Sequence, residues 1–367
     1  MEHREINTTT LREWLDTGKE VNILDVRPSH EREEWFIPGS IHVDAYHELK
    51  KNNPNSIKSI ELDKSFPVVT VCAAGKTSLI AADLLQKEGY EAYSLQGGMK
   101  SWSLAWNTAS LSYDNSEIIQ FRRTGKGCLS YLVISGNEAM VVDASLPVDV
   151  YREFLTQRNL HLKYVLETHI HADHLSRAKE LAAAYGLLPS IPENNIMAFS
   201  FNPVFDGDTF SLGEVEVRAI STPGHTLEST CYLVNNKSLL TGDTLFIKGV
   251  GRPDLKADHH EAMEKAGLLY HSLEKLLELD NLVVVLPGHN NKPVAFDHKV
   301  IQASLGKIFS EIPLLSLGKE GFVHSILGRT PATPENYLTI LEKNISGDFA
   351  DTNPIDLEAG ANRCAIL

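Results

Sequence analysis

Short apolar runs alternate with helical patterns over the first hundred residues of the chain. Val21–Val26 and Val68–Val71 are short and mostly apolar, which is typical of buried strands. Apolar side chains recur at helical spacing from Thr77 to Glu88, and Gly89 follows them as a helix C-cap. Strands that alternate with helices indicate a parallel sheet, so we expect an α/β domain over residues 1–108.

A different pattern begins beyond residue 116. Residues 109–116 are short of apolar side chains, and we interpret them as a linker. The following apolar runs predict strands at 130–134, 139–143, 215–220, 230–234 and 238–243, and helices at 175–185 and 260–278. Mixed strands with outer helices favour an αββα sandwich over residues 117–300. Residues 301–367, which are helical and then loop-like with several prolines, are expected to form a C-terminal extension of that domain.

The charge balance narrows the classes of partner. Of 367 residues, 34 are Lys or Arg and 48 are Asp or Glu, which gives a net charge of -14. This balance argues against nucleic acid and against an anionic membrane as partners. No apolar run reaches 18 residues and the N-terminus is charged, so we expect neither a membrane span nor a signal peptide. Four cysteines without a C-x-x-C pair favour a cytoplasmic location, and a homo-oligomer is compatible with these features.

The densest chemistry lies in residues 168–174, which read Thr-His-Ile-His-Ala-Asp-His. This segment follows the apolar strand Tyr164–Leu166 and precedes a helix, so its side chains can converge on a loop. Three further candidates, His225, Asp243 and His289, each follow a glycine, which lets backbone segments approach closely. We therefore expect these positions to build one metal site.

In these residues the chain resembles the metallo-β-lactamase superfamily, from about residue 117 to residue 300. That superfamily carries T-H-x-H-x-D-H, then a His, an Asp and a last His, on an αββα sandwich. The resemblance implies seven metal-ligand positions, which are His169, His171, Asp173, His174, His225, Asp243 and His289.

Two branches of the superfamily imply different reactions. In the glyoxalase-II-like branch the seven side chains hold two metals, here two zinc ions, for thioester hydrolysis. In the persulfide dioxygenase branch one Fe(II) is held by two His and one carboxylate, which correspond to His169, His225 and Asp243. Such a triad leaves positions open for substrate and O2. The remaining four side chains, His171, Asp173, His174 and His289, would then support the iron site or hold a second metal.

A further stretch favours the dioxygenase branch. Residues 249–254, Gly-Val-Gly-Arg-Pro-Asp, resemble the G-x-G-R-x-D segment of the dioxygenases. This implies that Arg252 and Asp254 belong to the catalytic pocket and support it. One position departs from the pattern, because Asn290-Asn291 stands where many dioxygenases have Asp-Tyr. The substrate contacts and the choice of metal are therefore open.

Cys72 is the candidate nucleophile of the first domain. It follows a buried strand and precedes a loop of small residues and a helix. Backbone N–H groups and the helix N-terminus favour a thiolate or persulfide there, and Lys76 adds a cation. A P-loop would need Gly at position 70, where Thr70 stands, and an inert buried thiol is the remaining alternative.

Residues 5–108 resemble single-domain rhodaneses in Asp25-Val-Arg27, in residues 34–42, in residues 97–102 and in the C-x-x-G-x-T loop. The resemblance implies that Cys72 accepts and passes on a sulfane sulfur. It also implies a substrate cradle made by Ala73, Ala74, Gly75, Lys76, Thr77 and Ser78. Ala73 stands where many thiosulfate-using members have Arg, so the sulfur donor is open.

The remaining cysteines carry less information. Cys128 and Cys231 lie in strand patterns and are expected to be core residues. Cys364-Ala-Ile-Leu367 matches a prenylation box, but no polybasic run precedes it, so we assign it to the C-terminal extension.

These resemblances imply a rhodanese fused to a non-haem iron persulfide dioxygenase, with one Fe(II) per chain. The substrate would be a small persulfide such as glutathione persulfide, oxidised by O2 to sulfite, while Cys72 exchanges sulfur with thiosulfate. The alternative enzyme is a dinuclear zinc thioester hydrolase with a sulfur-carrier domain. A non-enzymatic sulfur or metal sensor fits less well, because the ligand set is complete.

Overall fold

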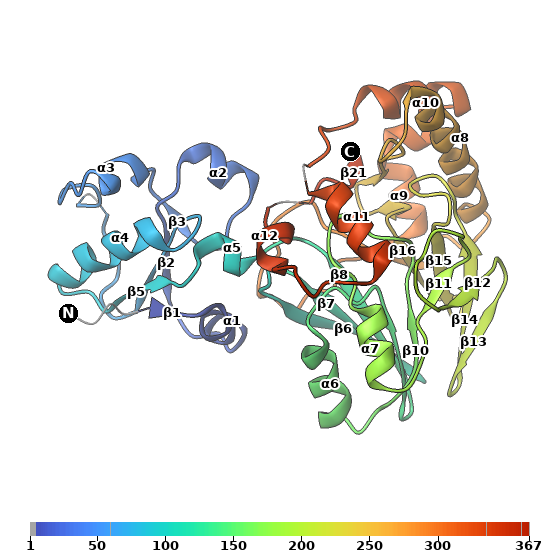
Figure 1. The fold of residues 1–367 in the computed structure, drawn as a ribbon, viewed down its shortest axis with the longest axis horizontal. Coiled ribbons are helices and arrows are strands. Elements are labelled where there is room, and N and C mark those ends of the chain that lie inside the picture. The colour runs from blue at the N-terminus through green and yellow to red at the C-terminus, as the bar shows by residue number, and fades with distance from the viewer. Residues whose placement is uncertain (1–4, 59, 335, 361, 367) are drawn as a thin grey trace.

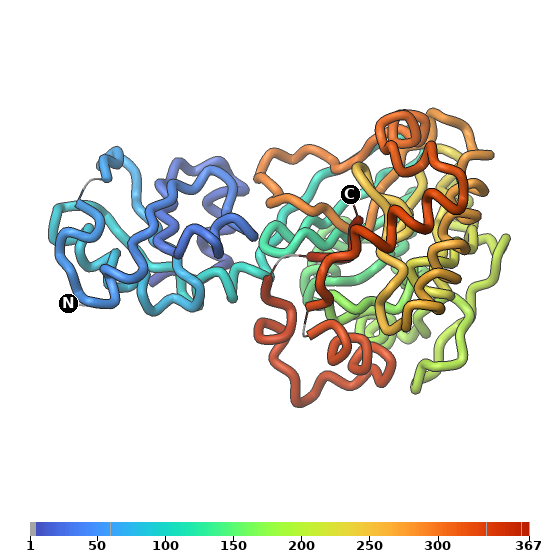
Figure 2. Tube along the Cα trace, turned by 90° about the horizontal axis from the view of Figure 1, so that it is seen from above, coloured from blue at the N-terminus to red at the C-terminus, as the bar shows by residue number. Residues whose placement is uncertain are grey.

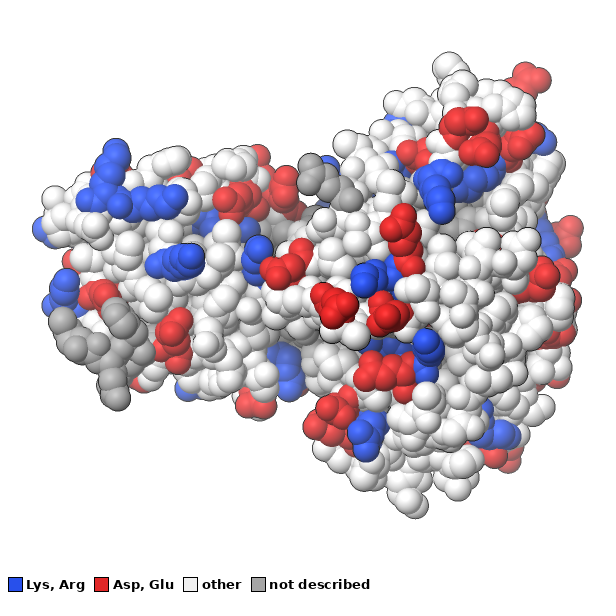
Figure 3. All heavy atoms as spheres, viewed as in Figure 1, with Lys and Arg blue, Asp and Glu red and all other residues white. Residues whose placement is uncertain are grey.

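The chain forms two bodies that touch, a smaller N-terminal one and a larger one (Figure 1). The computed structural model describes residues 5–58, 60–334, 336–360 and 362–366. Within these ranges no helix is both long enough and apolar enough to cross a membrane. Acidic and basic side chains are interspersed over the face shown in Figure 3.

The N-terminal body is a five-stranded parallel sheet in the order β1-β5-β4-β2-β3. Alternate residues of β4 face opposite sides, so that Val68 packs with α3 and α4 while Val69 packs with α1 and α5. The predicted parallel α/β fold is confirmed. The elements are β1 (Glu5–Ile6), α1 (Thr8–Asp16), β2 (Asn22–Asp25), α2 (Ser29–Glu34), β3 (Ile41–His42), α3 (Tyr46–Lys50), β4 (Val68–Val71), α4 (Lys76–Lys87), β5 (Ala92–Leu95) and α5 (Gly98–Trp102).

Two facing sheets form the centre of the larger body. The first has the order β12-β11-β10-β9-β8-β7-β6 and the second the order β13-β14-β15-β16-β19-β20. The first comprises β6 (Asn107–Tyr113), β7 (Ser116–Arg122), β8 (Leu129–Ser135), β9 (Glu138–Val142), β10 (His161–Leu166), β11 (Ser190–Pro192) and β12 (Asn202–Val204). The second comprises β13 (Thr209–Leu212), β14 (Val215–Ser221), β15 (Thr230–Val234), β16 (Ser238–Gly242), β19 (Val284–Pro287) and β20 (Ala303–Ser304).

Helices cover the outer face of each sheet. The first sheet packs against α6 (Val148–Gln157) and α7 (Ala178–Ala184), and the second against α8 (His259–Leu276), α9 (Leu305–Glu311) and α10 (Lys319–Gly328). A separate apolar cluster between the sheets joins Val133 and Leu166 to Val217 and Leu286. The expected αββα sandwich is therefore confirmed.

The last part of the chain wraps back over the sandwich (Figure 2). It contains η1 (Pro313–Ser316), α10, α11 (Tyr337–Ser346), α12 (Pro354–Glu358) and β21 (Ala365–Ile366). β21 pairs with β18 (Gly249–Gly251), which pairs in turn with β17 (Leu245–Phe246). The four residues that match a prenylation box thus include a short strand, and the Cys364 side chain is buried.

The expected linker at residues 109–116 is wrong. Most of it is the edge strand β6, which pairs antiparallel with β7 along its whole length. Its burial alternates, with Ala109 buried between the less buried Thr108 and the exposed Ser110, as in a strand with one solvated face. The scarcity of apolar side chains in residues 109–116 therefore reflects the edge position of β6 and not a lack of secondary structure.

The two bodies pack directly against each other. The Trp35 indole Nε1 donates to the Thr124 carbonyl at 3.0 Å, and Arg123 Nη2 donates to the Ser103 carbonyl at 2.9 Å. A Cβ added at Gly125 would lie 1.9 Å from the Trp102 carbonyl, so the backbones pass in close contact. At the same junction, α5 lies beside α12 (Figure 1).

Candidate metal centre and sulfur-carrier site

The loop that carries the His-rich segment is anchored at its first residue. β9 and β10 are parallel neighbours, so Asp143 at the end of β9 lies beside Thr168. Asp143 accepts hydrogen bonds from the Thr168 backbone N at 2.7 Å and from its hydroxyl at 2.8 Å. Asp143 itself adopts φ +56°, a conformation uncommon outside glycine, which is associated with functional sites.

Asp243 and His289 come from the same end of the second sheet. β16 and β19 are parallel neighbours. Asp243 is the first residue after β16, and His289 follows β19 after one glycine, Gly288. A Cβ at Gly288 would lie 2.7 Å from Asp243 Oδ1, and one at Gly251 would lie 1.9 Å from the Asp243 carbonyl. These glycines let three backbone segments converge around one carboxylate.

His169, His225 and Asp243 form one compact group, with donor atoms within 4.8 Å of one another. Asp243 Oδ2 lies 3.9 Å from His169 Nε2 and 3.5 Å from His225 Nε2. The opposite ring nitrogens are held in place: His169 Nδ1 lies 2.9 Å from the Thr168 hydroxyl, and His225 Nδ1 lies 2.8 Å from the Arg252 carbonyl. Each Nε2 is thereby directed toward the carboxylate.

The donor set of this group fits a metal ion. His169 Nε2 and Asp243 Oδ2 are buried and have no hydrogen-bond partner among the described residues. Leaving such atoms unpaired is costly, and a cation between them would satisfy them. Burial lowers the pKa of His169 and of His225, which favours the neutral imidazole that binds metals.

His171 lies beside this group rather than in it. Its Nε2 is 2.7 Å from Glu167 Oε2 and 3.2 Å from Asp143 Oδ1. Burial alone would lower the pKa of His171, but the two carboxylates raise it well above its ordinary value. Its ring still lies close to that of His169, with centroids 4.2 Å apart and the ring planes tilted by 57°.

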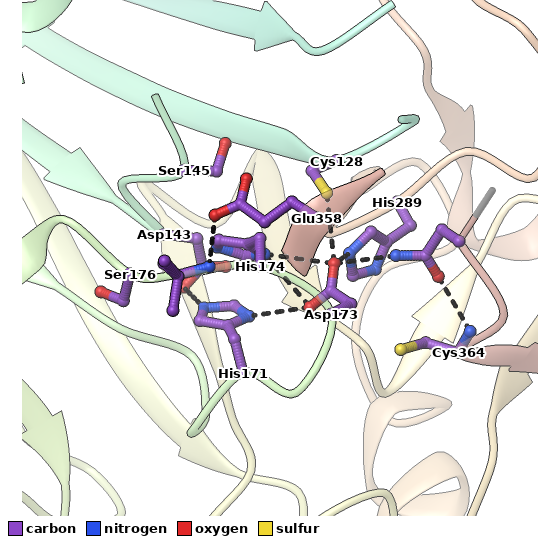
Figure 4. Close-up of polar contacts among 12 residues, drawn as sticks. Cys128, Asp143, Ser145, His171, Asp173, His174, Ser176, His289, Glu358 and Cys364 are labelled. Carbon is purple, nitrogen blue, oxygen red and sulfur yellow. Dashed lines mark hydrogen bonds and ion pairs between the residues drawn. The ribbon is translucent and has the colours of Figure 1, made fainter. Parts of the chain in front are cut away.

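Asp173, His174 and His289 form a second group, together with Cys128 (Figure 4). Asp173 Oδ2 lies 2.6 Å from His289 Nε2 and 3.2 Å from the Cys128 thiol, and Asp173 Oδ1 lies 3.1 Å from His174 Nδ1. Cys128 is buried as expected, but its sulfur faces this polar group. Nothing in the local sequence signals that contact, because Asp173 is 45 positions away.

Residues of the C-terminal extension also reach the site, and the sequence pattern did not indicate them. Asn344 donates to the carbonyls of His171 and His174 at 2.7 and 2.8 Å. Asn362 donates to Asp173 Oδ2 at 2.8 Å. Glu358 accepts from the Leu175 backbone N at 2.8 Å. The extension thus holds the ligand loop from outside.

Arg252 and Asp254 stand behind the ligands. The Arg252 guanidinium pairs with Asp254 at 2.7 and 2.8 Å and donates to the Pro331 carbonyl at 2.7 Å. Its backbone carbonyl is the partner of His225. Neither Arg252 nor Asp254 lines the cavity beside His289 or the cavity beside His169 and His171.

A cavity of about 200 Å³ opens beside the second group. His289, Asn290 and Asn291 line it together with Lys248 and Lys292. The positions that depart from the dioxygenase pattern therefore face this cavity, and two cations lie at its wall.

Cys72 lies at the end of β4, where the loop that follows it packs on α5. Its carbonyl accepts from the Met99 backbone N at 2.9 Å, and a Cβ at Gly98 would lie 2.1 Å from that carbonyl. The Ser78 hydroxyl donates to the Cys72 sulfur at 3.3 Å. The thiol is 2% exposed, whereas Lys76 is exposed at the start of α4.

Comparison with known proteins follows this division of the chain. Residues 7–105 match the Rhodanese-like domain, and residues 123–289 match the Metallo-beta-lactamase superfamily. An uncharacterised protein of Mycobacterium leprae is 36% identical over 186 residues, covering 43% of this chain and 83% of that protein. The chain belongs to the metallo-β-lactamase superfamily. It also carries a rhodanese-like domain at its N-terminal side, so both resemblances seen in the sequence are confirmed.

The other proteins that the chain is similar to have different names. Hydroxyacylglutathione hydrolase of Francisella philomiragia is 33% identical over 168 residues, which cover 44% of this chain and 62% of that enzyme. The chain thus spans less than two thirds of that relative. A metallo-beta-lactamase from Staphylococcus aureus superposes with a TM-score of 0.58 at 22% identity, covering 64% of this chain and 74% of that one. ETHE1 from Myxococcus xanthus superposes with a TM-score of 0.54 at 23% identity, covering 66% and 99%. These two likenesses show the superfamily fold.

Proposed function

We propose that this superfamily member is a persulfide dioxygenase joined to a sulfurtransferase. The observation that carries the proposal is the convergence of His169, His225 and Asp243, with His171 engaged by two carboxylates. Two His and one carboxylate are the ligand set of non-haem Fe(II) oxygenases. A ferrous ion held by them would supply open positions for a persulfide sulfur and for O2.

The other residues of the site prepare the substrate and exclude water. The three ligands are at most 2% exposed, so the reacting atoms are shielded from bulk solvent. Lys248 and Lys292 at the cavity wall suit the carboxylates of a persulfide such as glutathione persulfide. Overall, one persulfide, one O2 and one water yield the thiol and sulfite.

The rhodanese-like domain supports a sulfur substrate. Cys72 would carry a sulfane sulfur between thiosulfate and a small thiol, with Ser78 as a hydrogen-bond donor to its sulfur. The residues Ala73 to Ser78 are proposed as the cradle of the transferred group. A thiosulfate-derived persulfide is a substrate for the metal domain, which gives the fusion of the two domains a chemical reason.

A second candidate function is thioester hydrolysis with two zinc ions. Two observations favour it. One is the similarity to a hydroxyacylglutathione hydrolase, and the other is that all seven ligand positions of the superfamily are occupied here. The two proposals differ in their use of oxygen and in the number and kind of metal.

Metal content and oxygen uptake separate the two candidates. Protein produced with both metals available should contain about one iron per chain and consume O2 with glutathione persulfide. His225→Ala and Asp243→Ala should each lose that iron and the uptake, because each removes a ligand of the triad. His271→Ala, which alters an exposed histidine on α8, is the matched control and should keep both. Hydrolysis of a glutathione thioester by an iron-free dizinc protein, with no oxygen uptake, would overturn the proposal.

A further inference from the structure

We infer that the cavity between the two bodies is the site where a small zwitterionic thiol docks to receive sulfur from Cys72, and that the metal domain and its C-terminal extension build one of its walls. The inference rests on the sulfurtransferase role proposed for Cys72 and does not depend on the reaction of the metal centre. The rhodanese-like domain by itself would leave this cavity open on one side.

The cavity adjoins the loop that carries Cys72. It has a volume of about 150 Å³. Ala73, the residue after Cys72, lines it, and so does Met99, whose backbone N–H donates to the Cys72 carbonyl at 2.9 Å. A sulfane sulfur on Cys72 lies one S–S bond, about 2 Å, beyond the thiol sulfur. Since Cys72 is only 2% exposed, this outer sulfur is the atom that an acceptor meets first.

The opposite wall comes from the larger body. Gly125, Ala359 and Gly360 line the cavity on that side, and their small size leaves space that larger residues would fill. Glu358, next to Ala359, is buried against Arg123 at 2.7 Å, which fixes this wall to the sandwich. An acceptor must therefore fit between the two bodies, which favours a small molecule over the surface of a folded protein.

Charges of both signs face the cavity. Its lining includes four charged side chains, which are Arg27, Glu31, Glu34 and Lys100. Lys100 pairs with Asp356 at 3.3 Å and Glu34 with Arg363 at 3.4 Å, and the side chains of Lys100 and Glu34 are 52% and 59% exposed. Such exposed pairs are weak, so both side chains can exchange their partners for the carboxylate and the ammonium of a ligand. An amino-acid-derived thiol such as glutathione carries both groups and matches this arrangement better than a simple anion does.

The transfer balances in two steps without another reactant. In the first, a bond forms between Cys72 Sγ and the outer sulfur of thiosulfate, and sulfite leaves with the electron pair of the broken S–S bond. In the second, the thiolate of the docked acceptor attacks the outer sulfur of the Cys72 persulfide, and the electron pair of that bond returns to Cys72 Sγ. The Ser78 hydroxyl, which donates to this sulfur at 3.3 Å, stabilises the thiolate that results. The proton of the acceptor thiol passes to solvent.

Occupancy of the cavity can be measured without either activity. S-methylglutathione keeps the charged groups of glutathione but has no thiol, and methylthioethanol is a neutral counterpart. In the full-length protein, saturating S-methylglutathione should slow the alkylation of Cys72 by iodoacetamide several-fold, as measured by mass spectrometry of the peptide that contains Cys72. Methylthioethanol should give no protection. Equal rates with and without S-methylglutathione, or equal protection by the neutral thioether, would overturn the inference.

Ala359→Trp tests the wall that the extension supplies. The larger side chain should fill the cavity and raise the KM for glutathione, in transfer from thiosulfate, by roughly tenfold or more with little change in kcat. Ala350→Trp places the same side chain at an exposed position of the extension outside the cavity, and it should behave as wild type. Thermal unfolding checks that both variants are folded. An unchanged KM in folded Ala359→Trp would show that the extension does not form this wall. If wild type transfers no sulfur from thiosulfate, the proposed function fails, and the alkylation rates still decide whether the cavity binds the ligand.

Discussion

His169 and His171 are two positions apart on one loop, yet their contacts give them different roles. His169 directs Nε2 at Asp243, whereas His171 directs Nε2 at Glu167 and Asp143. A spacing of two residues indicates that both rings can reach a metal. It does not show whether a ring nitrogen is already engaged by a carboxylate. That depends on Asp143, which lies 28 positions earlier in the chain.

The separation of roles leads to a prediction for His171→Ala. The variant should keep most of the iron, since the triad of His169, His225 and Asp243 is unaltered. Its stability should fall by roughly 3–5 kcal/mol, because two buried carboxylates lose their cationic partner. Metal analysis beside thermal unfolding measures both effects, with Asp243→Ala as the metal-free comparison. Loss of iron from His171→Ala to the level of Asp243→Ala would place His171 in the first coordination shell.

At the level of elements, the sequence predicted most of the strands that carry the site. β4 and β15 have the predicted bounds, and the predicted hairpin is β8 and β9 within one residue at each end. Apolar runs are informative there because these strands are buried on both faces. β6 was missed because only one of its faces is covered. Contacts such as Asn362 with Asp173, 189 positions apart, have no local pattern and could not be predicted.

Helix α12 is held by a buried network of ion pairs that no sequence motif predicted. Glu358 is fully buried and lies 2.7 Å from Arg123, with Arg177 at 3.9 Å. Burial alone would raise the pKa of Glu358, but these two cations outweigh it and hold the pKa below its ordinary value. Because Glu358 also accepts from Leu175, α12 is coupled to the metal-ligand loop.

We expect Glu358→Ala to lower the free energy of unfolding by roughly 3–5 kcal/mol, since it leaves the buried charge of Arg123 without its carboxylate partner. Asp356→Ala on the same helix is the control, and should cost at most about 1 kcal/mol because its pair with Lys100 is exposed. The folded pKa of Glu358 is depressed, so its contribution is complete above the ordinary value of 4.5 and is lost as the pH falls through the folded value. Chemical denaturation at pH 7 and at pH 4 should therefore show a smaller difference between wild type and Glu358→Ala at pH 4. An equal effect of both substitutions would contradict this account.

At the level of the whole molecule, the Cys72 loop and the His-rich site lie in two bodies that pack directly against each other. Helix α5 ends at Trp102 and β6 begins at Asn107, and a cavity of about 150 Å³ lies between the bodies, lined by Ala73 and Lys100 on one side and Gly125 and Gly360 on the other. Cys72 is almost fully buried in the N-terminal body, and His169, His225 and Asp243 are almost fully buried in the larger one. Direct delivery of sulfur from Cys72 to the metal site would need a movement that this packing opposes, so we expect a small thiol to carry it.

Oxygen uptake from thiosulfate should accordingly require added glutathione. Cys72→Ser should lose uptake from thiosulfate with glutathione, yet keep uptake from glutathione persulfide supplied directly. Cys231→Ser, a buried cysteine of the second sheet, should behave as wild type in both assays. The intact chain is the proper material, because a cut near Ser110 would split β6. Uptake from thiosulfate without any added thiol would show direct transfer and refute the diffusible route.

The contacts that complete the metal centre also bear on how the chain reaches its native state. Asp173 is joined to His289 across 116 positions and to Asn362 across 189. Loop closure over such distances is slow, and folding rates fall as native contacts become less local. We expect the hairpin of β8 and β9 to form early, and the ligand set to assemble after both sheets and the extension have docked. Until then, we expect the segment 168–174 to be exposed to solvent with only some of its native partners. The metal that binds first would depend on which ion meets the unfolded segment, whereas the metal that remains would depend on the affinity of the folded site.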